Sequence, residues 1–128
     1  MVNANKILND LIALRHWCAG NLPIENSYVA YDLLLIVAEA STANRKLTVK
    51  NLFNSAPHSY TAVRMHYKRL VNDGWFELVE DEQDRRVKYV VPTKQFIGTI
   101  NNYLAVVKKD LGPRYYPKCD QCTSFNEV

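Results

Sequence analysis

Residues 5–18 carry apolar side chains at the spacing of one helix face. The stripe consists of Ile7, Leu11, Leu14 and Cys18, and it is widened by Leu8, Ile12 and Trp17. Positions three and four residues apart lie on the same side of an α-helix, so the pattern predicts an amphipathic helix. Gly20 ends the pattern, and Pro23 supports a break in the chain shortly after it.

A second helix is predicted to begin at Ile24 or Glu25 and to continue to about Thr42. Residues 28–40 are apolar on nearly every face of such a helix. A helix that is apolar all round has no side suited to water, so it belongs in the interior. We therefore expect this helix at the centre of the domain.

Two shorter helices should follow, separated by a tight turn. Thr48 can cap the first, which covers about residues 49–54, and Ser59 or His58 can cap the second, which continues to about residue 72. Ser and Thr are favoured at this position because their side-chain oxygen accepts a hydrogen bond from a backbone N–H of the first helical turn.

Residues with β propensity then occupy positions 75–80 and 86–91, and the loop between them, 81–85, is fully polar. This pattern predicts a β-hairpin. Thr93 is the expected N-cap of a last helix over about residues 94–111, whose apolar positions again repeat at helical spacing.

The predicted order of elements is that of a winged helix-turn-helix, in which two helices joined by a tight turn are followed directly by a hairpin. The expected fold is mainly α with a small β-hairpin wing. We expect one winged-helix domain over residues 1–111, with its core at 24–93. The helices at 3–20 and 94–111 have no partner inside a minimal winged helix and are expected to serve dimerisation. Residues 112–128 are expected to form an irregular tail.

The distribution of charge along the chain is more informative than its total. The 128 residues suit one domain, are 48% hydrophobic, and include 16 Lys and Arg against 13 Asp and Glu, so the net charge is only +3. Between Arg45 and Asn72, however, there are six basic residues and no acidic one. That stretch covers both short helices, and a helix-turn-helix places its second helix in the DNA major groove. The charge pattern therefore favours binding to nucleic acid.

Three short motifs occur at matching places in and around these helices. They are Leu47-Thr48-Val49, then Val63…Leu70…Gly74-Trp75, and finally Asp84-Arg85-Arg86 followed by Pro92-Thr93. In this order and spacing the chain resembles the MarR-type winged-helix transcriptional regulators over about residues 24–93. Pro92 departs from the Leu that is typical of the family, and His66 stands where the family usually has an apolar residue. The resemblance implies a sequence-specific regulator that binds double-stranded DNA, most simply a repressor that occludes a promoter.

The second short helix is expected to contact bases. Its side chains Val63, Tyr67 and Leu70 share one face and should pack on the domain, which leaves the opposite face for DNA. The residues expected on that side are Ser59, Tyr60, Thr61, Arg64, Met65 and Lys68, and those near the helix start are best placed to meet base edges. Arg64 has the planar fork that matches guanine O6 and N7. Tyr60 could equally be a packing residue, since it lies seven positions before Tyr67.

Other basic side chains are expected at the DNA backbone. On the helices, Lys46, Lys50, Lys68 and Arg69 are interpreted as phosphate contacts, and a merely solvated helix face is the alternative for any of these lysines taken singly. In the hairpin, Arg86 matches the arginine of the family's Asp-x-Arg motif, and Arg85 and Lys88 lie beside it. A guanidinium gains from the enhanced negative potential of a narrow minor groove. Asp84 would orient or neutralise one of these arginines in the free protein.

The resemblance also implies an assembly and a ligand class. In the family, the first and last helices intertwine into a two-fold dimer, which presents two recognition helices to a pseudo-palindromic site. A homodimer is therefore expected, with double-stranded DNA as its partner. A cleft between the dimer helices and the winged domain could hold a small aromatic effector, because Trp17, Tyr28, Tyr31 and Tyr103 are expected near it. The residues identify no particular ligand.

Three cysteines are too few for a disulfide framework, which fits a reducing compartment. With no signal-peptide pattern and no apolar run long enough to cross a bilayer, the expected address is the cytoplasm, without a membrane partner. Cys119 and Cys122 supply two ligands where zinc prefers four, so a metal would need two tails of a dimer or a histidine. A redox-sensitive disulfide is another alternative, but idle thiols are the simplest interpretation, and no cofactor is expected. Cys18 is expected to be buried and inert, with peroxide sensing as the alternative.

An enzymatic function is not expected. The chain has four Gly and no Gly-rich phosphate loop, and no Ser/His/Asp or Cys/His order is recognisable. Acidic residues at the hairpin tip are too exposed for paired catalytic acids. Two alternatives to a DNA-binding regulator stay open, namely a winged-helix module that binds protein, which the acidic stretch 77–84 favours, and a phage or plasmid accessory factor. The basic second short helix, with no acids in it, favours DNA.

Overall fold

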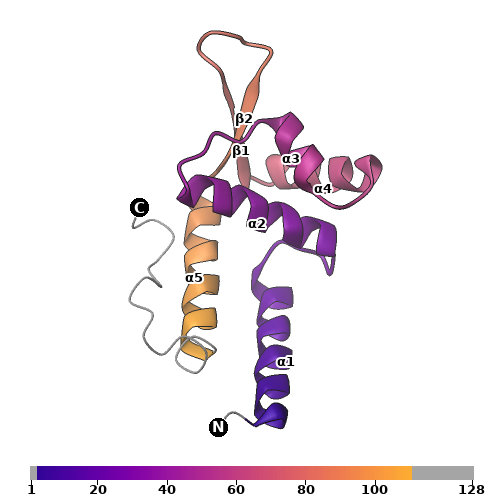
Figure 1. Ribbon diagram of the computed structural model, residues 1–128, viewed down its shortest axis with the longest axis vertical. Helices are drawn as coiled ribbons and strands as arrows, with labels where there is room; N and C mark the ends of the chain where they lie inside the picture. The colour runs from indigo at the N-terminus through magenta and orange to yellow at the C-terminus, as the bar shows by residue number, and fades with distance from the viewer. Residues whose placement is uncertain (1–2, 111–128) are drawn as a thin grey trace.

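A computed structural model describes residues 3–110, and within them the chain forms five helices and one antiparallel hairpin. The elements are α1 (Ala4–Asn21), α2 (Tyr28–Thr42), α3 (Val49–Ser55), α4 (Tyr60–Asn72), β1 (Phe76–Glu80), β2 (Lys88–Pro92) and α5 (Lys94–Asp110). The predicted fold, mainly α with a β-hairpin wing, is confirmed. Figure 1 shows α2 across the middle of the molecule, with α3, α4 and the hairpin on one side of it and α1 and α5 on the other. None of the helices in residues 3–110 is long and apolar enough to span a membrane.

The interior is centred on α2, as its apolar sequence predicts. Leu34 of α2 is buried, and so are Leu52 of α3, Leu70 of α4 and Phe96 of α5. The ring of Phe76, at the base of the hairpin, packs edge-on against Phe96 with 5.8 Å between the ring centroids. Full burial of one such side chain stabilises the fold by about 1.5–3 kcal/mol. These contacts fix the hairpin and the two short helices on a common core.

The start of α2 differs from the prediction. The helix begins at Tyr28, not at Ile24 or Glu25, and Ser27 is its N-cap, whose Oγ accepts hydrogen bonds from two backbone N–H groups of the first turn. Glu25 and Asn26 have φ angles of 47° and 58°. A right-handed helix cannot include such left-handed residues, so they form a turn instead. Residues 22–27 are therefore a linker between α1 and α2.

The other helix starts follow the predicted capping chemistry. Thr48 caps α3 and Ser59 caps α4, each through a side-chain oxygen that accepts a backbone N–H, at 3.0 Å and 3.3 Å. Thr93 caps α5 in the same way, and its hydroxyl also donates to the carbonyl of Gly74 at 2.6 Å. Gly74 has a φ of 81°, which suits glycine after the end of α4.

The hairpin pairs Leu78 of β1 opposite Val90 of β2. The N–H of Val90 donates to the carbonyl of Leu47 at 2.8 Å, so β2 lies between β1 and the segment that precedes α3. The second strand begins at Lys88 and not at the predicted position 86. Arg86 belongs to the turn, because its N–H donates to the carboxylate of Asp84 at 3.0 Å.

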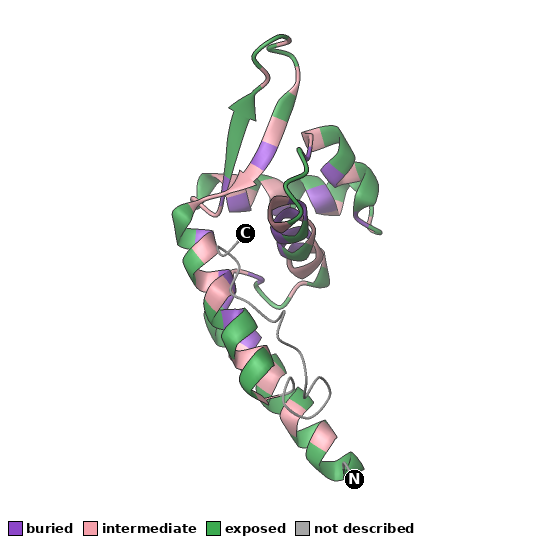
Figure 2. Ribbon diagram, turned by 60° about the vertical axis from the view of Figure 1, so that its left-hand side comes forward, coloured by how far each residue is buried: buried purple, intermediate pink, exposed green. Residues whose placement is uncertain are grey.

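Helices α1 and α5 contact each other and extend away from the core (Figure 2). At the core end of α1, Cys18 is buried, as expected. Further along the same stripe, Leu8, Leu11 and Ile12 are 57%, 47% and 54% exposed. Much of the apolar face that the sequence assigns to α1 is therefore uncovered in a single chain.

Candidate nucleic-acid interface

Helix α4 separates its side chains into two faces. The prediction that one face packs on the domain is confirmed, because Val63 and Leu70 are buried and Tyr67 is partly buried. His66 is also buried, at 8% exposure. The exposed side chains of the helix include Thr61, Arg64, Met65 and Lys68. No acidic residue occurs between Tyr60 and Asn72, so this exposed face carries only positive or neutral groups.

The packing interpretation of Tyr60 is confirmed, and its contact with DNA stays a prediction. Its ring lies 5.4 Å from the ring of Phe53 on α3, and Phe53 in turn contacts Tyr67 at 5.2 Å. Even so, Tyr60 is 68% exposed. Burial raises the pKa of Tyr67, whose ring lies deeper. One edge of Tyr60 therefore stabilises the contact between α3 and α4, and the remainder of its ring is free for another molecule.

Arg69 does not lie with the exposed basic residues. Its Nη2 donates to the carbonyl of Pro23 at 2.9 Å, and its Nε lies 3.4 Å from a carboxylate oxygen of Glu25. The side chain is only 19% exposed. The sequence grouped Arg69 with the phosphate contacts, but the structure turns it toward the linker between α1 and α2. The sequence offers one signal for this orientation: Arg69 follows the buried His66 by three residues, so the two side chains lie on the same side of the helix.

The basic residues before and in α3 are exposed but differ in their surroundings. Lys50 lies on an exposed position of α3. The Nζ of Lys46 lies 5.3 Å from the centroid of the Tyr89 ring, near the turn end of the two strands. Such a cation–π contact stabilises by about 0.5–1 kcal/mol at an exposed site. Lys46 is thus tied to the hairpin, whereas Lys50 projects from the helix-turn-helix.

The wing presents its arginines at its tip. Arg86 is 90% exposed, and its Nε and Nη2 donate to the two carboxylate oxygens of Asp84 at 3.1 Å and 3.3 Å. These hydrogen bonds lower the pKa of Asp84. Arg85 is exposed beside them, and the Nζ of Lys88 donates to Glu80 at 3.2 Å. Ion pairs this exposed contribute little to stability, so they order the side chains without burying their charge.

The turn of the wing is organised by Asp81. One of its carboxylate oxygens accepts the hydroxyl of Tyr89 at 2.8 Å, and the other accepts the backbone N–H groups of Gln83 and Asp84 at 3.1 Å and 3.0 Å. The hydrogen bond from Tyr89 is the main cause that lowers the pKa of Asp81, and the same bond raises the pKa of Tyr89. The carboxylate of Asp81 is thus the acceptor for the first part of the turn.

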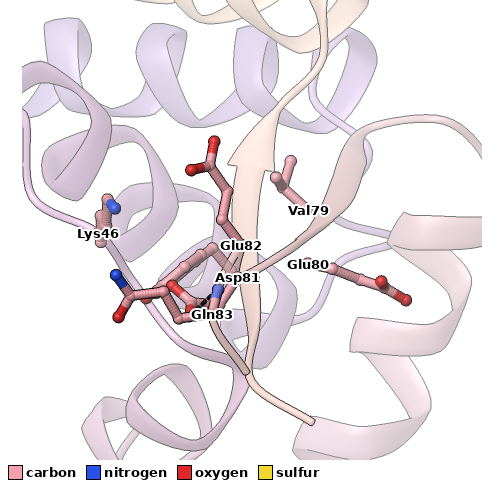
Figure 3. A pocket seen from close by; sticks show the side chains of 7 residues that line it. Lys46, Val79, Glu80, Asp81, Glu82 and Gln83 are labelled. Atoms are coloured by element: carbon pink, nitrogen blue, oxygen red, sulfur yellow. Dashed lines mark hydrogen bonds between the residues drawn. The ribbon is translucent and has the colours of Figure 1, made fainter. Parts of the chain in front are cut away.

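A hollow lies beside this turn (Figure 3). It is lined by Lys46, Val79, Glu80, Asp81, Glu82, Gln83 and Tyr89. Figure 3 shows Glu80 and Glu82 pointing away from each other, so the carboxylates do not converge on one point. Among residues 3–110, no group of three or more His, Cys, Asp or Glu side chains could hold a metal ion. The suggested site at Cys119 and Cys122 lies outside the described residues.

The aromatic residues that were expected near an effector cleft mostly contact one another. Trp17 stacks on Tyr103 with 5.7 Å between the centroids, and the hydroxyls of Tyr31 and Tyr103 lie 2.6 Å apart. Burial and this hydrogen bond raise the pKa of Tyr103. Tyr28 lies elsewhere, exposed, with the guanidinium of Arg15 over its ring at 5.4 Å. Three of the four rings therefore form part of the packing where α1, α2 and α5 meet.

No family model matches the chain, and no curated protein does. Solved structures do. A mutant of MarR from E. coli matches with a TM-score of 0.59 and 17% identity, over 88% of this chain and 82% of that chain. The same mutant complexed with operator DNA matches with a TM-score of 0.56 and 19% identity, over 84% and 74%. The heme sensor protein PefR from Streptococcus agalactiae, in complex with heme, matches with a TM-score of 0.52 and 19% identity, over 83% and 74%. The chain has the winged-helix fold of the MarR-type transcriptional regulators.

Proposed function

We propose that this protein is a transcription regulator that binds a specific double-stranded DNA sequence as a homodimer, most simply as a cytoplasmic repressor that occludes a promoter. The observation that carries the proposal is the exposed face of α4, which bears Thr61, Arg64 and Lys68 and no acidic group. Helix α4 follows a tight turn after α3, in the arrangement that inserts a helix into the major groove. The fold shared with MarR in complex with operator DNA supports the same interpretation.

The proposed contacts divide into bases and phosphates. Near the start of α4, base edges are contacted by Ser59, Tyr60, Thr61 and Arg64, with Met65 beside them. Arg64 makes the most specific contact, because its two nitrogens match O6 and N7 of one guanine. Lys68 and Lys50 contact phosphates and set the register of the protein on the duplex.

The wing contributes its tip to the same complex. Arg86 enters the minor groove next to the major-groove site, and Arg85 and Lys88 contact the neighbouring backbone. Asp84 holds the guanidinium of Arg86 in one orientation while leaving it 90% exposed. An arginine oriented before binding loses less conformational freedom when it enters the groove. Negative potential is enhanced in a narrow minor groove, which favours this cation.

The proposal is tested by selecting binders from a random duplex library at near-physiological salt. We expect a pseudo-palindromic consensus for the wild type. The Arg64→Ala variant should lose discrimination at one position in each half-site, at a cost of about 1–3 kcal/mol, because the bidentate contact to guanine is gone. Lys6→Ala is the matched control, because it also removes one positive charge but from α1, far from α4 along the chain and on the other side of α2.

Two results would contradict the proposal, one for the function as a whole and one for Arg64 alone. If no sequence is enriched and binding by all three proteins disappears as salt rises, only generic attraction to phosphates remains. The winged-helix module that binds protein would then be the better interpretation of the fold. Enrichment of one consensus that Arg64→Ala and Lys6→Ala leave equally intact would keep the DNA-binding function and remove Arg64 from its proposed role.

A further inference from the structure

The linker between α1 and α2 contacts the C-terminal half of α4 through polar groups. Arg69 donates from Nη2 to the carbonyl of Pro23 at 2.9 Å, and its Nε lies 3.4 Å from Glu25. His66 lies 3.1 Å, through its Nε2, from the hydroxyl of Ser27. The Nη2 of Arg69 also approaches Nδ1 of His66 at 3.4 Å. Two side chains of α4 are therefore joined both to the linker and to each other.

The protons in this network have a defined arrangement. A guanidinium nitrogen only donates, so Nδ1 of His66 accepts the hydrogen bond from Arg69. The proton of the neutral imidazole is then on Nε2, which donates to Ser27. Ser27 is also the N-cap of α2, so the same oxygen serves α2 and α4. The network thereby connects the linker, the start of α2 and one side of α4.

Directional hydrogen bonds can fix the rotation of a helix on the core, which apolar packing alone does not fix. The buried side chains Val63 and Leu70 hold α4 on the core, but apolar burial is non-directional and tolerates small rotations of a helix. The Nη2 of Arg69 donates a directional hydrogen bond to the carbonyl of Pro23, and the charge of the guanidinium attracts the carboxylate of Glu25 across 3.4 Å. Both contacts end on a linker whose residues Glu25 and Asn26 have left-handed backbone angles and so define its path.

We propose that Arg69 is a positioning residue for DNA recognition, which locks the orientation of α4 to the linker that follows α1. This inference rests on the proposed function, in which α4 contacts DNA and α1 belongs to the dimer interface. In such a dimer, the distance between the two α4 helices sets the spacing of the two half-sites. Arg69 therefore determines which spacing is preferred, and it makes no phosphate contact itself.

The experiment uses the selected consensus with its half-sites moved apart or together in steps of one base pair. Affinity is measured at several salt concentrations for the wild type, Arg69→Ala and Arg69→Lys. We expect one preferred spacing for the wild type and a spread over neighbouring spacings for Arg69→Ala, with about tenfold weaker binding at the optimum. The slope of log affinity against log salt should not change. Arg69→Lys should behave like Arg69→Ala, because a flexible ammonium group lacks the planar guanidinium that faces Pro23, Glu25 and His66 in one fixed arrangement.

Two results would overturn the inference. A salt slope that falls by about 0.9 in Arg69→Ala, with the affinity restored in Arg69→Lys, would mean a direct phosphate contact. A lower melting temperature without any change in the preferred spacing, measured on folded protein, would mean a merely structural role. Glu25→Gln provides a milder variant, because the carboxylate is 65% exposed, and it should broaden the spacing preference partly.

The wild type separates this inference from the proposed function. A wild type without a preferred sequence overturns the proposed function and the inference together. A wild type with one preferred spacing, which Arg69→Ala and Glu25→Gln both share, overturns the inference alone.

Discussion

His66 shows how one buried residue connects α4 to its surroundings. Burial is the main cause that lowers its pKa below the usual 6.5, and the positive charge of Arg69 lowers it further. The carboxylate of Glu25 acts in the opposite direction and raises it. Above pH 6.5 the imidazole is therefore mostly neutral in the folded protein, and this is the form that accepts from Arg69 and donates to Ser27.

This neutral state makes the stability depend on pH. Because the folded pKa of His66 lies below the unfolded one, the unfolded chain takes up a proton first as the pH falls. The contribution is complete above about pH 6.5 and is lost below it, with a slope of at most about 1.4 kcal/mol per pH unit. Urea unfolding at pH 7.5, 6.5 and 5.5 measures it. His66→Gln, whose amide can still donate to Ser27, should show a flatter dependence, and equal slopes in both proteins would refute this assignment.

The sequence predicted the packed face of α4 from Val63, Tyr67 and Leu70, but it grouped Arg69 with the wrong face, for a physical reason. The periodicity of α4 indicates which residues face the core, and the buried His66 lies on the same side of the helix as Val63 and Leu70. The partner of Arg69 depends on a segment 46 residues away, at Pro23, which comes close only once the fold has formed. A cation on a helix looks the same in sequence whether it faces a phosphate or a backbone carbonyl.

At the scale of elements, the carboxylate of Asp81 orders the first part of the wing turn. We expect Asp81→Ala to increase the amide exchange rates of Gln83 and Asp84 about tenfold, because both N–H groups lose their acceptor. Hydrogen exchange followed by NMR measures this. Glu82→Ala removes the same charge from the same turn without removing these hydrogen bonds, and its exchange rates should stay near those of the wild type. Similar acceleration in both variants would assign the order of the turn to charge alone.

The elements that sequence predicted well are those determined by local chemistry. Thr48, Ser59 and Thr93 cap their helices through their own side chains and the next turn of backbone. The start of α2 was placed too early because Ile24 continues the apolar pattern although it lies in the linker, where it is buried. The local signals for the turn are Asn26, which tolerates a left-handed backbone, and Ser27, which caps α2, and the prediction did not use them.

At the scale of the whole molecule, much of the apolar stripe of α1 has nothing to cover it within residues 3–110 of a single chain. Leu8, Leu11 and Ile12 lie together at helical spacing, and Leu104 of α5 is also 37% exposed. Single exposed apolar residues are common on protein surfaces, but a continuous stripe marks a surface that another molecule covers. The exposed stripe lies in the half of α1 that projects away from the core (Figure 1). A second copy, related by a two-fold axis, can cover it with its own stripe.

The dimer is tested by placing a charge in this stripe. We expect the wild type to sediment at roughly twice the chain mass of 14.8 kDa and Ile12→Glu at that mass, because an unpaired carboxylate in an apolar interface is costly. Val79→Glu is the control, since it changes a residue of similar exposure on the wing and should remain dimeric. Ile12→Glu should also bind a single half-site and the full pseudo-palindrome with equal affinity, because each monomer carries one α4. A wild type that sediments as a stable monomer at micromolar concentration would contradict the dimer, and the uncovered stripe would then require a different partner.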